Sequence, residues 1–332
     1  SETTQMEINL SSFDVLKDES RSSAFNPNDP AFTGAGSVED YGNTGWKTAE
    51  VKWIVDELGV ENLSLVTGAR HEAYELNIDV FDSTNYATGS KDTLSDSSGG
   101  ESSLTAAFAQ FIWEIDERWD SSVGLRYESW KSKNGYYVDD DAGTPELDLV
   151  NTPSRSENHF SPKFSLGLKP ADEWIVRYSL AKAYRFPIVE ELYSQFEAFA
   201  SKNLANPDLD PEEGLHHNVM IERGLDQGYV RVNLYRENID NVIESQTTLL
   251  DGGVSLRTFI PVDEVQTTGI EFIVNAENVF IDALDIRYNV TYTDSEIIKN
   301  DADTSLEGNH FPRMPEWRSN LLATYHISRS EE

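Results

Sequence analysis

Apolar and polar residues alternate with a period of two along ten or more segments of this 332-residue chain. Successive side chains of a β-strand point to opposite faces, so each segment predicts a strand with one apolar and one polar face. The clearest segment places Leu284, Ile286, Tyr288, Val290 and Tyr292 on one face and Asp285, Arg287, Asn289, Thr291 and Thr293 on the other. Similar strands are predicted within residues 6–10, 51–55, 63–69, 104–115, 123–128, 160–168, 174–181, 216–223, 229–237, 270–274 and 321–327.

The connections between these segments alternate in length. Short ones lie near residues 58–62, 116–121, 169–173, 224–228 and 276–283, and long ones near 11–45, 75–103, 138–158, 186–213, 244–261 and 295–312. Strands that cross a bilayer must pair every backbone group, so they close into a ring with tight turns at one end and loops at the other. We therefore predict an all-β fold: an antiparallel up-and-down transmembrane β-barrel, present in part as about twelve strands, with long extracellular loops.

Aromatic residues near the predicted strand ends fit the two rings that mark membrane interfaces. These residues are Trp53, Trp113, Trp130, Trp174, Tyr178, Tyr292 and Trp317. The competing interpretation is a soluble β-sandwich, such as a carbohydrate-binding or hydrolytic domain, because sandwich strands also alternate. Sandwich strands typically have about five or six residues, whereas several segments here are longer, which favours the barrel.

Composition narrows the possible partners. The chain has 26 basic and 59 acidic residues and a formal charge of −33, which argues against binding a nucleic-acid backbone. Such acidity suits solubility or high salt, or a surface that attracts cations. The absence of cysteine excludes disulfides and thiolate metal sites. No apolar run of about 18 residues predicts a membrane-spanning helix, but a spanning strand needs only about ten alternating residues.

Three sequence elements in the second half resemble one known family. They are AYRFPIVEELY at Ala183–Tyr193, NPDLDPE at Asn206–Glu212 and VDEVQTTGIE at Val262–Glu271, followed by FPRMPEWRSNLLATYH at residues 311–326. Together they resemble the barrel of a TonB-dependent outer-membrane receptor, over about 145 residues and in the family's order. Residues before Ala183 resemble the family only in the rhythm of strands and loops.

The resemblance implies a location and partners. It predicts a bacterial outer-membrane protein that takes up a scarce nutrient, most often a ferric siderophore, with energy from a TonB-type inner-membrane protein. Such barrels have about 22 strands around a plugged lumen, so we expect residues 1–332 to be a barrel portion without the plug domain and the last strands. A passive porin or adhesin-like barrel remains an alternative with the same strand pattern.

The segment after Pro187 predicts a short helix in the longest loop. Ile188, Leu192, Phe196 and Phe199 recur at helical spacing, and proline favours the first turn of a helix. One interpretation is that this helix only folds the loop back onto the barrel mouth. The other is that Tyr184, Arg185, Tyr193 and Phe196 contact ligand there. For an anionic aromatic chelate, the further candidates are Arg257, His310 and Arg313.

Catalysis and metal binding find little support in the sequence. There is no GxSxG motif, no HExxH motif and no glycine-rich phosphate loop, so we expect neither an enzyme nor a cofactor. His216 and His217 are consecutive and point to opposite faces of a strand, which disfavours a shared metal. Asp139–Asp141 lacks the glycine and the terminal glutamate of a calcium loop. We therefore predict no metal site.

Overall fold

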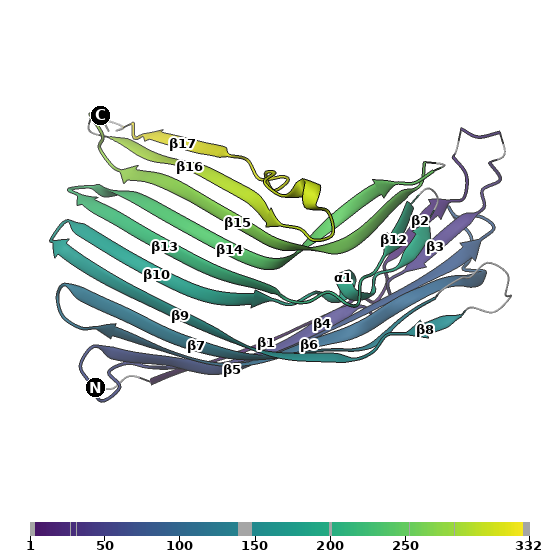
Figure 1. Ribbon diagram of the computed structural model, residues 1–332, viewed down its shortest axis with the longest axis horizontal. Coiled ribbons are helices and arrows are strands. Elements are labelled where there is room, and N and C mark those ends of the chain that lie inside the picture. Colours follow the sequence, from purple (N-terminus) through teal and green to yellow (C-terminus); the bar gives the residue numbers. More distant parts are fainter. Residues whose placement is uncertain are drawn as a thin grey trace, which may run out of the picture.

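The computed structural model describes residues 4–26, 28–30, 32–138, 148–198, 201–251, 253–281 and 283–327, which form one curved sheet (Figure 1). Its long strands are β1 (Thr4–Asp14), β4 (Gly45–Val55), β5 (Leu63–Ser83), β6 (Thr93–Glu114), β7 (Trp119–Val138), β9 (Arg155–Ala171), β10 (Trp174–Arg185), β13 (Glu212–Leu225), β14 (Gly228–Leu249), β15 (Ser255–Ala276), β16 (Leu284–Lys299) and β17 (Trp317–Tyr325). Each pairs antiparallel with the next in this order. The prediction of an all-β meander of about twelve strands is confirmed.

The sheet is a single layer. Val232 and Ile286, which a sandwich would bury between two layers, are both partly exposed. The β-sandwich alternative is therefore wrong. Within the described residues, β1 pairs only with β4 and β17 only with β16, so the sheet stays open as a section of barrel wall. No helix in this part of the chain is both long and apolar enough to cross a membrane.

Short and long connections lie at opposite edges of the sheet. Residues 56–62, 115–118, 172–173, 226–227 and 277–283 connect strands at one edge, which we call the short-turn edge. The opposite, long-loop edge carries residues 15–44, 84–92, 139–154, 186–211, 250–254 and 300–316. It also holds the small elements β2 (Glu19–Ser23), β3 (Gly36–Asp40), β8 (Leu149–Asn151), β11 (Phe196–Ala198), β12 (Ser201–Leu204), α1 (Val189–Tyr193) and the 3-10 turn Thr304–Leu306 (Figure 1). The predicted alternation between two edges is confirmed, but residues 250–254 are fewer than residues 56–62 or 277–283, because β14 and β15 extend through most of the predicted loop.

Several predicted loops are wrong in extent, because the strands continue through them. β5 reaches Ser83 and β6 starts at Thr93, so most of the predicted loop 75–103 is paired sheet. β14 and β15 likewise take up most of 244–261. The predicted loops 138–158 and 295–312 are shortened at one end by β9 and β16, and 11–45 contains the hairpin β2–β3. Residues 93–103 are rich in serine, glycine and acid and lack the alternating pattern. Residues 75–83 do alternate, with Leu76, Ile78 and Val80 buried in one cluster, so this part of β5 could have been recognised.

The predicted helix is confirmed at its start and wrong in its length. α1 begins after Pro187 but ends at Tyr193, and Ser194 has extended backbone angles. The amide of Ser194 still donates to the carbonyl of Glu190, while its own carbonyl accepts from Asn203 Nδ2 at 2.6 Å. Phe196 therefore lies in β11, which pairs with β12, and Phe199 lies outside the described residues.

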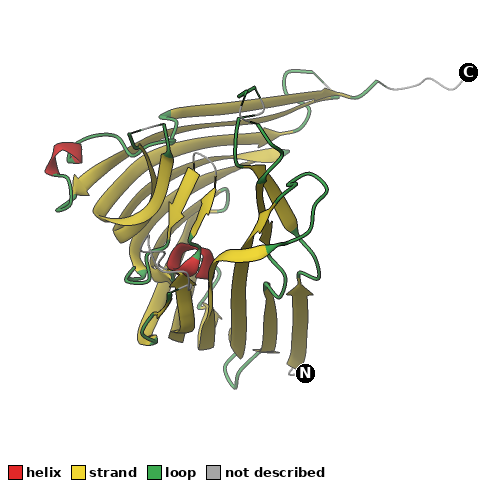
Figure 2. Cartoon of the chain, turned by 90° about the vertical axis from the view of Figure 1, so that its right-hand side faces the viewer, coloured by secondary structure: helices red, strands yellow, loops and turns green. Residues whose placement is uncertain are grey.

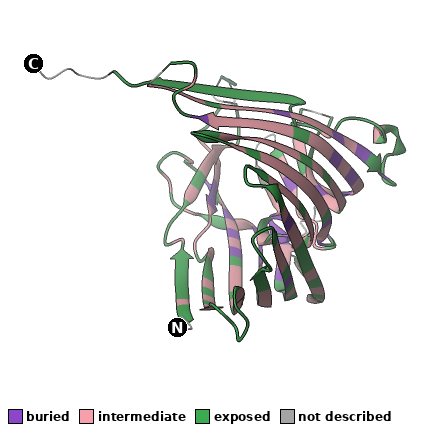
Figure 3. Cartoon of the chain, turned by 90° about the vertical axis from the view of Figure 1, so that its left-hand side faces the viewer, coloured by how far each residue is buried: buried purple, intermediate pink, exposed green. Residues whose placement is uncertain are grey.

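The two faces of the sheet differ in chemistry, as the alternation predicts. On β7, Val123, Leu125 and Tyr127 are 53%, 50% and 40% exposed on the outer, convex face, whereas Arg126 and Glu128 pair with each other on the inner face. Figure 3 shows exposed and partly buried residues alternating along the strands. One predicted interfacial aromatic is wrong: Trp130 is 2% exposed and lies on the inner face, because its even number places it with Glu128.

Candidate functional site

All seven candidate ligand residues lie at the long-loop edge. Tyr184 and Arg185 end β10, Tyr193 ends α1, and Phe196 begins β11. The structure brings these four together, and Arg257 lies beside them because β12 pairs parallel with β15, opposite Asn203. The connection between β16 and β17 carries His310 and Arg313, away from this group. Figure 2 looks onto this edge, with α1 inside the curve of the sheet.

Arg185 joins three parts of the loop. Its guanidinium donates to Glu191 Oε1 at 3.0 Å and to Glu212 Oε1 at 2.7 Å. Glu191 also accepts from the amide of Ile188 and so fixes the first turn of α1, while Glu212 accepts from the amide of Ile243 on β14. The hydrogen bond to Glu212, together with the charge of both carboxylates, raises the pKa of Arg185 above its ordinary value. The side chain therefore holds the loop together at the end of β10.

Tyr193 fits against two glycines in the barrel wall. Its side chain is 2% exposed, and burial raises the pKa of its hydroxyl. A Cβ atom at Gly100 of β6 would lie 2.5 Å from the ring, and one at Gly135 of β7 would lie 2.2 Å from it. Both glycines are thus needed for the ring to approach the backbone. Next to it, Ser98 Oγ donates to the carbonyl of Gln195 at 2.7 Å.

A buried apolar cluster holds the loop 186–211 against the inner face. The loop contributes Leu192, Tyr193 and Leu209, and Phe186 stacks on Trp130 with ring centroids 5.9 Å apart. The strands contribute Leu76, Ile78, Val80, Trp130, Ile243 and Phe259. Phe196 packs against this cluster while still partly exposed. The longest loop is therefore folded into the mouth of the barrel section, as the structural interpretation of the helix predicts.

Tyr184 borders the water-filled side of this arrangement. Its hydroxyl donates to Glu213 at 2.8 Å, and its ring lies 4.2 Å from that of His159. It lines a cavity of about 240 Å³ with Arg185, Phe186 and residues of β5, β6 and β7. This places an aromatic ring, a hydroxyl and a guanidinium edge on one small cavity.

The remaining candidates are open to solvent. Arg257 donates from Nε to Ser245 Oγ at 2.9 Å and lies over the Phe259 ring at 5.1 Å. His310 is 64% exposed, with Asp294 at 3.5 Å. Arg313 has a left-handed backbone (φ 63°) and lines a groove of about 380 Å³ with Arg318 and other inner-face residues. These three side chains remain accessible to a ligand.

Basic residues gather on the inner wall, although the chain as a whole is strongly acidic. Lys52, Arg126, Lys163 and Lys182 line one cavity of about 410 Å³ whose single acidic lining residue is Glu50. Three of the four make ion pairs, with Glu7 at 2.5 Å, Glu128 at 2.7 Å and Glu213 at 2.5 Å. Lys163 makes no ion pair with any described residue. Its stem lies flat over Gly124, where a Cβ would meet its Cε at 2.7 Å.

Sequence reasoning missed several residues that shape this site. Trp130, Gly100 and Gly135 support the loop, yet they lie in stretches without a clean alternation. His216 and His217 behave as predicted, since one contacts Glu237 and the other Tyr178. Among the described residues, no group of three or more His, Asp or Glu side chains is placed to hold a metal ion. Asp139–Asp141 lies outside the described residues.

Comparison with known proteins places these features in a family context. The family model described as TonB dependent receptor-like, beta-barrel, matches residues 9–330. No curated protein matches the sequence. One solved structure with a similar fold is the copper transporter OprC, with a TM-score of 0.68 and 16% sequence identity; the match covers 98% of this chain and 47% of that chain. Another is the ferric yersiniabactin uptake receptor FyuA from Yersinia pestis, with a TM-score of 0.62 and 16% identity, covering 89% of this chain and 41% of that chain. A third is the ferripyoverdine receptor of the outer membrane of Pseudomonas aeruginosa, with a TM-score of 0.60 and 12% identity, covering 98% of this chain and 41% of that chain.

These similarities concern the fold alone, because the sequence identity to each of the three structures is 16% or less. The chain spans less than half the length of each of these structures. Its strands and loops therefore correspond to one section of a larger barrel.

Proposed function

The chain belongs to the β-barrel family of TonB-dependent receptors, and from this premise we propose that it forms part of the wall of a transporter for a ferric siderophore. It is an outer-membrane β-barrel protein and not an enzyme. The short-turn edge then faces the periplasm and the long-loop edge faces outward. An inner-membrane protein of the TonB type supplies the energy in this proposal, through a part of the receptor outside this chain.

The basic side chains on the inner face of the sheet are the observation that supports this class of ligand. A ferric siderophore of the aromatic chelate kind presents anionic oxygens and rings, which ammonium and guanidinium groups recognise by charge-assisted hydrogen bonds and cation–π contacts. Lys163, which makes no ion pair with a described residue, offers such a group in the cavity of about 410 Å³, while the other three basic residues there are paired with glutamates. This gathering supports an anionic ligand despite the formal charge of −33.

The candidate residues divide into two roles in this proposal. Arg257, His310 and Arg313 are accessible and contact the incoming ligand, while Tyr184 and Phe196 line its path. Arg185 and Tyr193 act through the loop, since their polar and apolar contacts are already made within the chain. Sequence changes at Arg257 should therefore alter affinity, and changes at Arg185 should alter the fold of the loop.

Uptake by the complete receptor tests the ligand class. A deletion strain should lose growth on one or more ferric siderophores as the only iron source, and the complete gene should restore it. Lys163→Glu should reduce uptake of that radiolabelled chelate by about tenfold, the equivalent of roughly 1.4 kcal/mol. The matched control is Lys131→Glu on the exposed outer side of β7, which should leave uptake unchanged. Normal growth of the deletion strain on every ferric chelate tested, with loss of copper or haem uptake, would contradict the proposed ligand.

The energy requirement separates this transporter from a passive porin. Uptake of the chelate should stop when the inner-membrane energising protein is deleted or the proton gradient is collapsed. A porin would continue to equilibrate its solute under either treatment. Continued uptake at an unchanged rate would therefore replace the receptor proposal with the passive one.

A further inference from the structure

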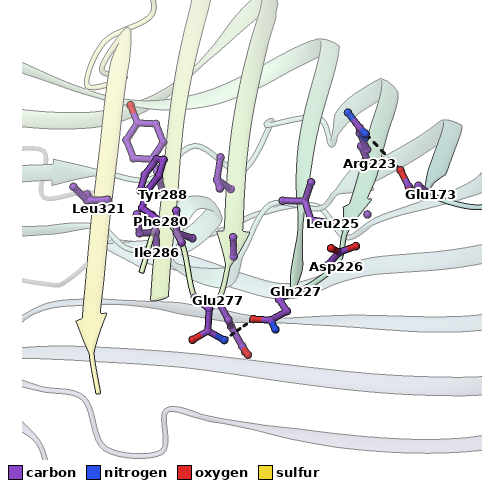
Figure 4. Close-up of a pocket in the computed structure, with 15 residues that line it drawn as sticks. Glu173, Arg223, Leu225, Asp226, Gln227, Glu277, Phe280, Ile286, Tyr288 and Leu321 are labelled. Atoms are coloured by element: carbon purple, nitrogen blue, oxygen red, sulfur yellow. Dashed lines mark hydrogen bonds and ion pairs between the residues drawn. The ribbon is translucent and has the colours of Figure 1, made fainter. Parts of the chain in front are cut away.

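A groove of about 830 Å³ lies on the outer face at the short-turn edge (Figure 4). Its floor consists of apolar and aromatic side chains from three neighbouring strands, Val274, Ile286, Tyr288 and Leu321. In the register of β15–β17 these residues share one face with Ile270, which is 44% exposed. The floor is therefore continuous with the apolar surface that faces lipid.

The turn between β15 and β16 forms one side of the groove with an apolar tip. Phe280 is 94% exposed and has a left-handed backbone (φ 65°), and the adjacent Ile281 is 54% exposed. A bulky residue keeps such a backbone only when its surroundings hold it there. They do so here: Asn278 accepts from the amide of Ala283 at 2.7 Å and donates to Gln227 in the next turn. These hydrogen bonds hold the turn, with Phe280 at its exposed tip.

The groove holds one cation at the end of β13 and carboxylates on the turns beyond it. Arg223 lies over the Trp174 ring at 5.6 Å, the kind of aromatic–cation pair found at membrane interfaces. The Arg223 side chain is 54% exposed, and its guanidinium has only a loose contact with Glu173, at 3.5 Å. Two further acids, Asp226 and Glu277, line the groove on the turns. In the register of the sheet Arg223 lies in the same row as Val274, Tyr288 and Leu321, and the carboxylates follow on the turns.

We propose that this groove binds one zwitterionic phospholipid of the periplasmic leaflet. The phosphate faces Arg223, the head-group ammonium faces Asp226 and Glu277, and an acyl chain lies along Tyr288 and Leu321 beside Phe280. The combination of a cation on the strand with carboxylates on the turns selects this occupant, because an anionic head group without an ammonium would lie against those carboxylates. Continuity of the floor with the lipid-facing surface favours lipid over a periplasmic protein. The inference does not depend on which nutrient the receptor imports.

Native mass spectrometry of the complete receptor tests the site. The purified protein is mixed with equal amounts of phosphatidylethanolamine and phosphatidylglycerol that carry the same acyl chains. We expect one phosphatidylethanolamine to be retained in preference to phosphatidylglycerol. Arg223→Gln should lower its retention by about tenfold, because a charge-assisted hydrogen bond to phosphate is lost. Arg118→Gln, at the neighbouring short turn 115–118 and outside the groove, is the matched control and should change nothing.

Two further variants keep the test decisive. The double variant Asp226→Asn with Glu277→Gln should remove the preference for phosphatidylethanolamine while leaving total lipid retention similar, because only the ammonium partners are lost. Phe280→Ser should weaken retention of both lipids, and heat-modifiable migration on gels verifies that each variant is folded. Equal retention of both lipids by the unmodified receptor, or equal loss in Arg223→Gln and Arg118→Gln, would overturn the proposal. Unchanged retention in Phe280→Ser would instead assign the tip to a protein contact.

Discussion

Gly100 and Gly135 let the ring of Tyr193 approach the strand backbone, and this contact fixes the longest loop in the barrel mouth. Arg185 reinforces it from the end of β10 through Glu191 and Glu212. Polar and apolar contacts thus act on the same loop from two sides. Single residues of this kind shape the mouth without having to touch a ligand.

Gly135→Ala should loosen the loop in the complete receptor. The new methyl group would lie 2.1 Å from Thr152 Oγ1 and 2.2 Å from the Tyr193 ring, so the ring must move. Overpacking of this kind costs about 1–3 kcal/mol. Limited proteolysis should then cut residues 186–211 several-fold faster. Gly224→Ala, whose Cβ would meet nothing closer than 3.6 Å, is the control and should cleave at the original rate; equal rates in both variants would refute the packing argument.

Acid should release the hairpin β2–β3. The hydrogen bond to Arg21, assisted by Lys91, lowers the pKa of Glu19. Burial raises the pKa of Asp40, but the hydrogen bonds from Lys91 and from the Gly42 amide, together with the charge of Lys91, outweigh burial and leave this pKa lowered. A carboxylate whose pKa is lowered in the folded protein binds protons more readily when the hairpin β2–β3 is detached from the sheet. The ionised carboxylates therefore stabilise the attached hairpin above about pH 4.3, and this stabilisation is lost as the pH falls. Hydrogen exchange at residues 36–40 should accelerate between pH 6 and 3.5 relative to β9. Glu19→Gln should weaken this dependence, and an unchanged ratio would contradict the assignment.

Each long strand has a membrane part and an extension beyond it. A strand of 22 residues, such as β14, spans about 70 Å, whereas about ten residues cross the membrane. The alternation of apolar and polar residues is clean in the membrane part, where one face meets lipid and the other meets water. Above it the alternation is lost in stretches such as residues 93–103, and elsewhere buried apolar side chains of the strands pack under the loop 186–211; the strands continue because the backbone ladder continues.

The face assignment can be tested on neighbouring residues of β16. Val290→Arg places a charge on the lipid face and should destabilise the folded barrel by about 2–4 kcal/mol, whereas Asn289→Arg points into the wet interior and should cost less than about 1 kcal/mol. Urea titration of the complete receptor in lipid vesicles measures both. The same substitution one residue apart changes only the face, so comparable losses at both positions would show that the faces are assigned wrongly.

The sequence contained what sets the topology but not all of what shapes the mouth. Alternation at residues 284–293 and the short turns predicted the meander, because lipid imposes a strict pattern on the strands. Residues 93–103, TLSDSSGGESS, were predicted as loop, since serines and glycines whose inner face is covered by the loop 186–211 cannot be distinguished in sequence from a polar connection. Arg185 could be singled out by its motif, but its partners Glu191 and Glu212 depend on how the loop folds. Trp130 was placed at an interface because one residue number decides which face a strand residue occupies.

As a whole, the described part of the chain is an open section of barrel wall. β1 and β17 each leave one edge unpaired, and unpaired edges in lipid or water invite association. Residues 1–332 expressed alone should therefore aggregate, or insert without the heat-modifiable migration of a closed barrel, and should not take up ligand. The complete receptor is the control. A monomeric, heat-modifiable 332-residue species would mean that the section closes by itself.

The apolar faces of these strands meet lipid, and their charged faces meet a water-filled interior. The most direct test is spin-label accessibility in the complete receptor in a bilayer, with single cysteines placed at residues 286–293 of β16, where this chain has none of its own. Even-numbered positions should be accessible to oxygen and odd-numbered ones to a water-soluble nickel complex, with a period of two. Uniform accessibility along the segment, or the opposite phase, would contradict the account.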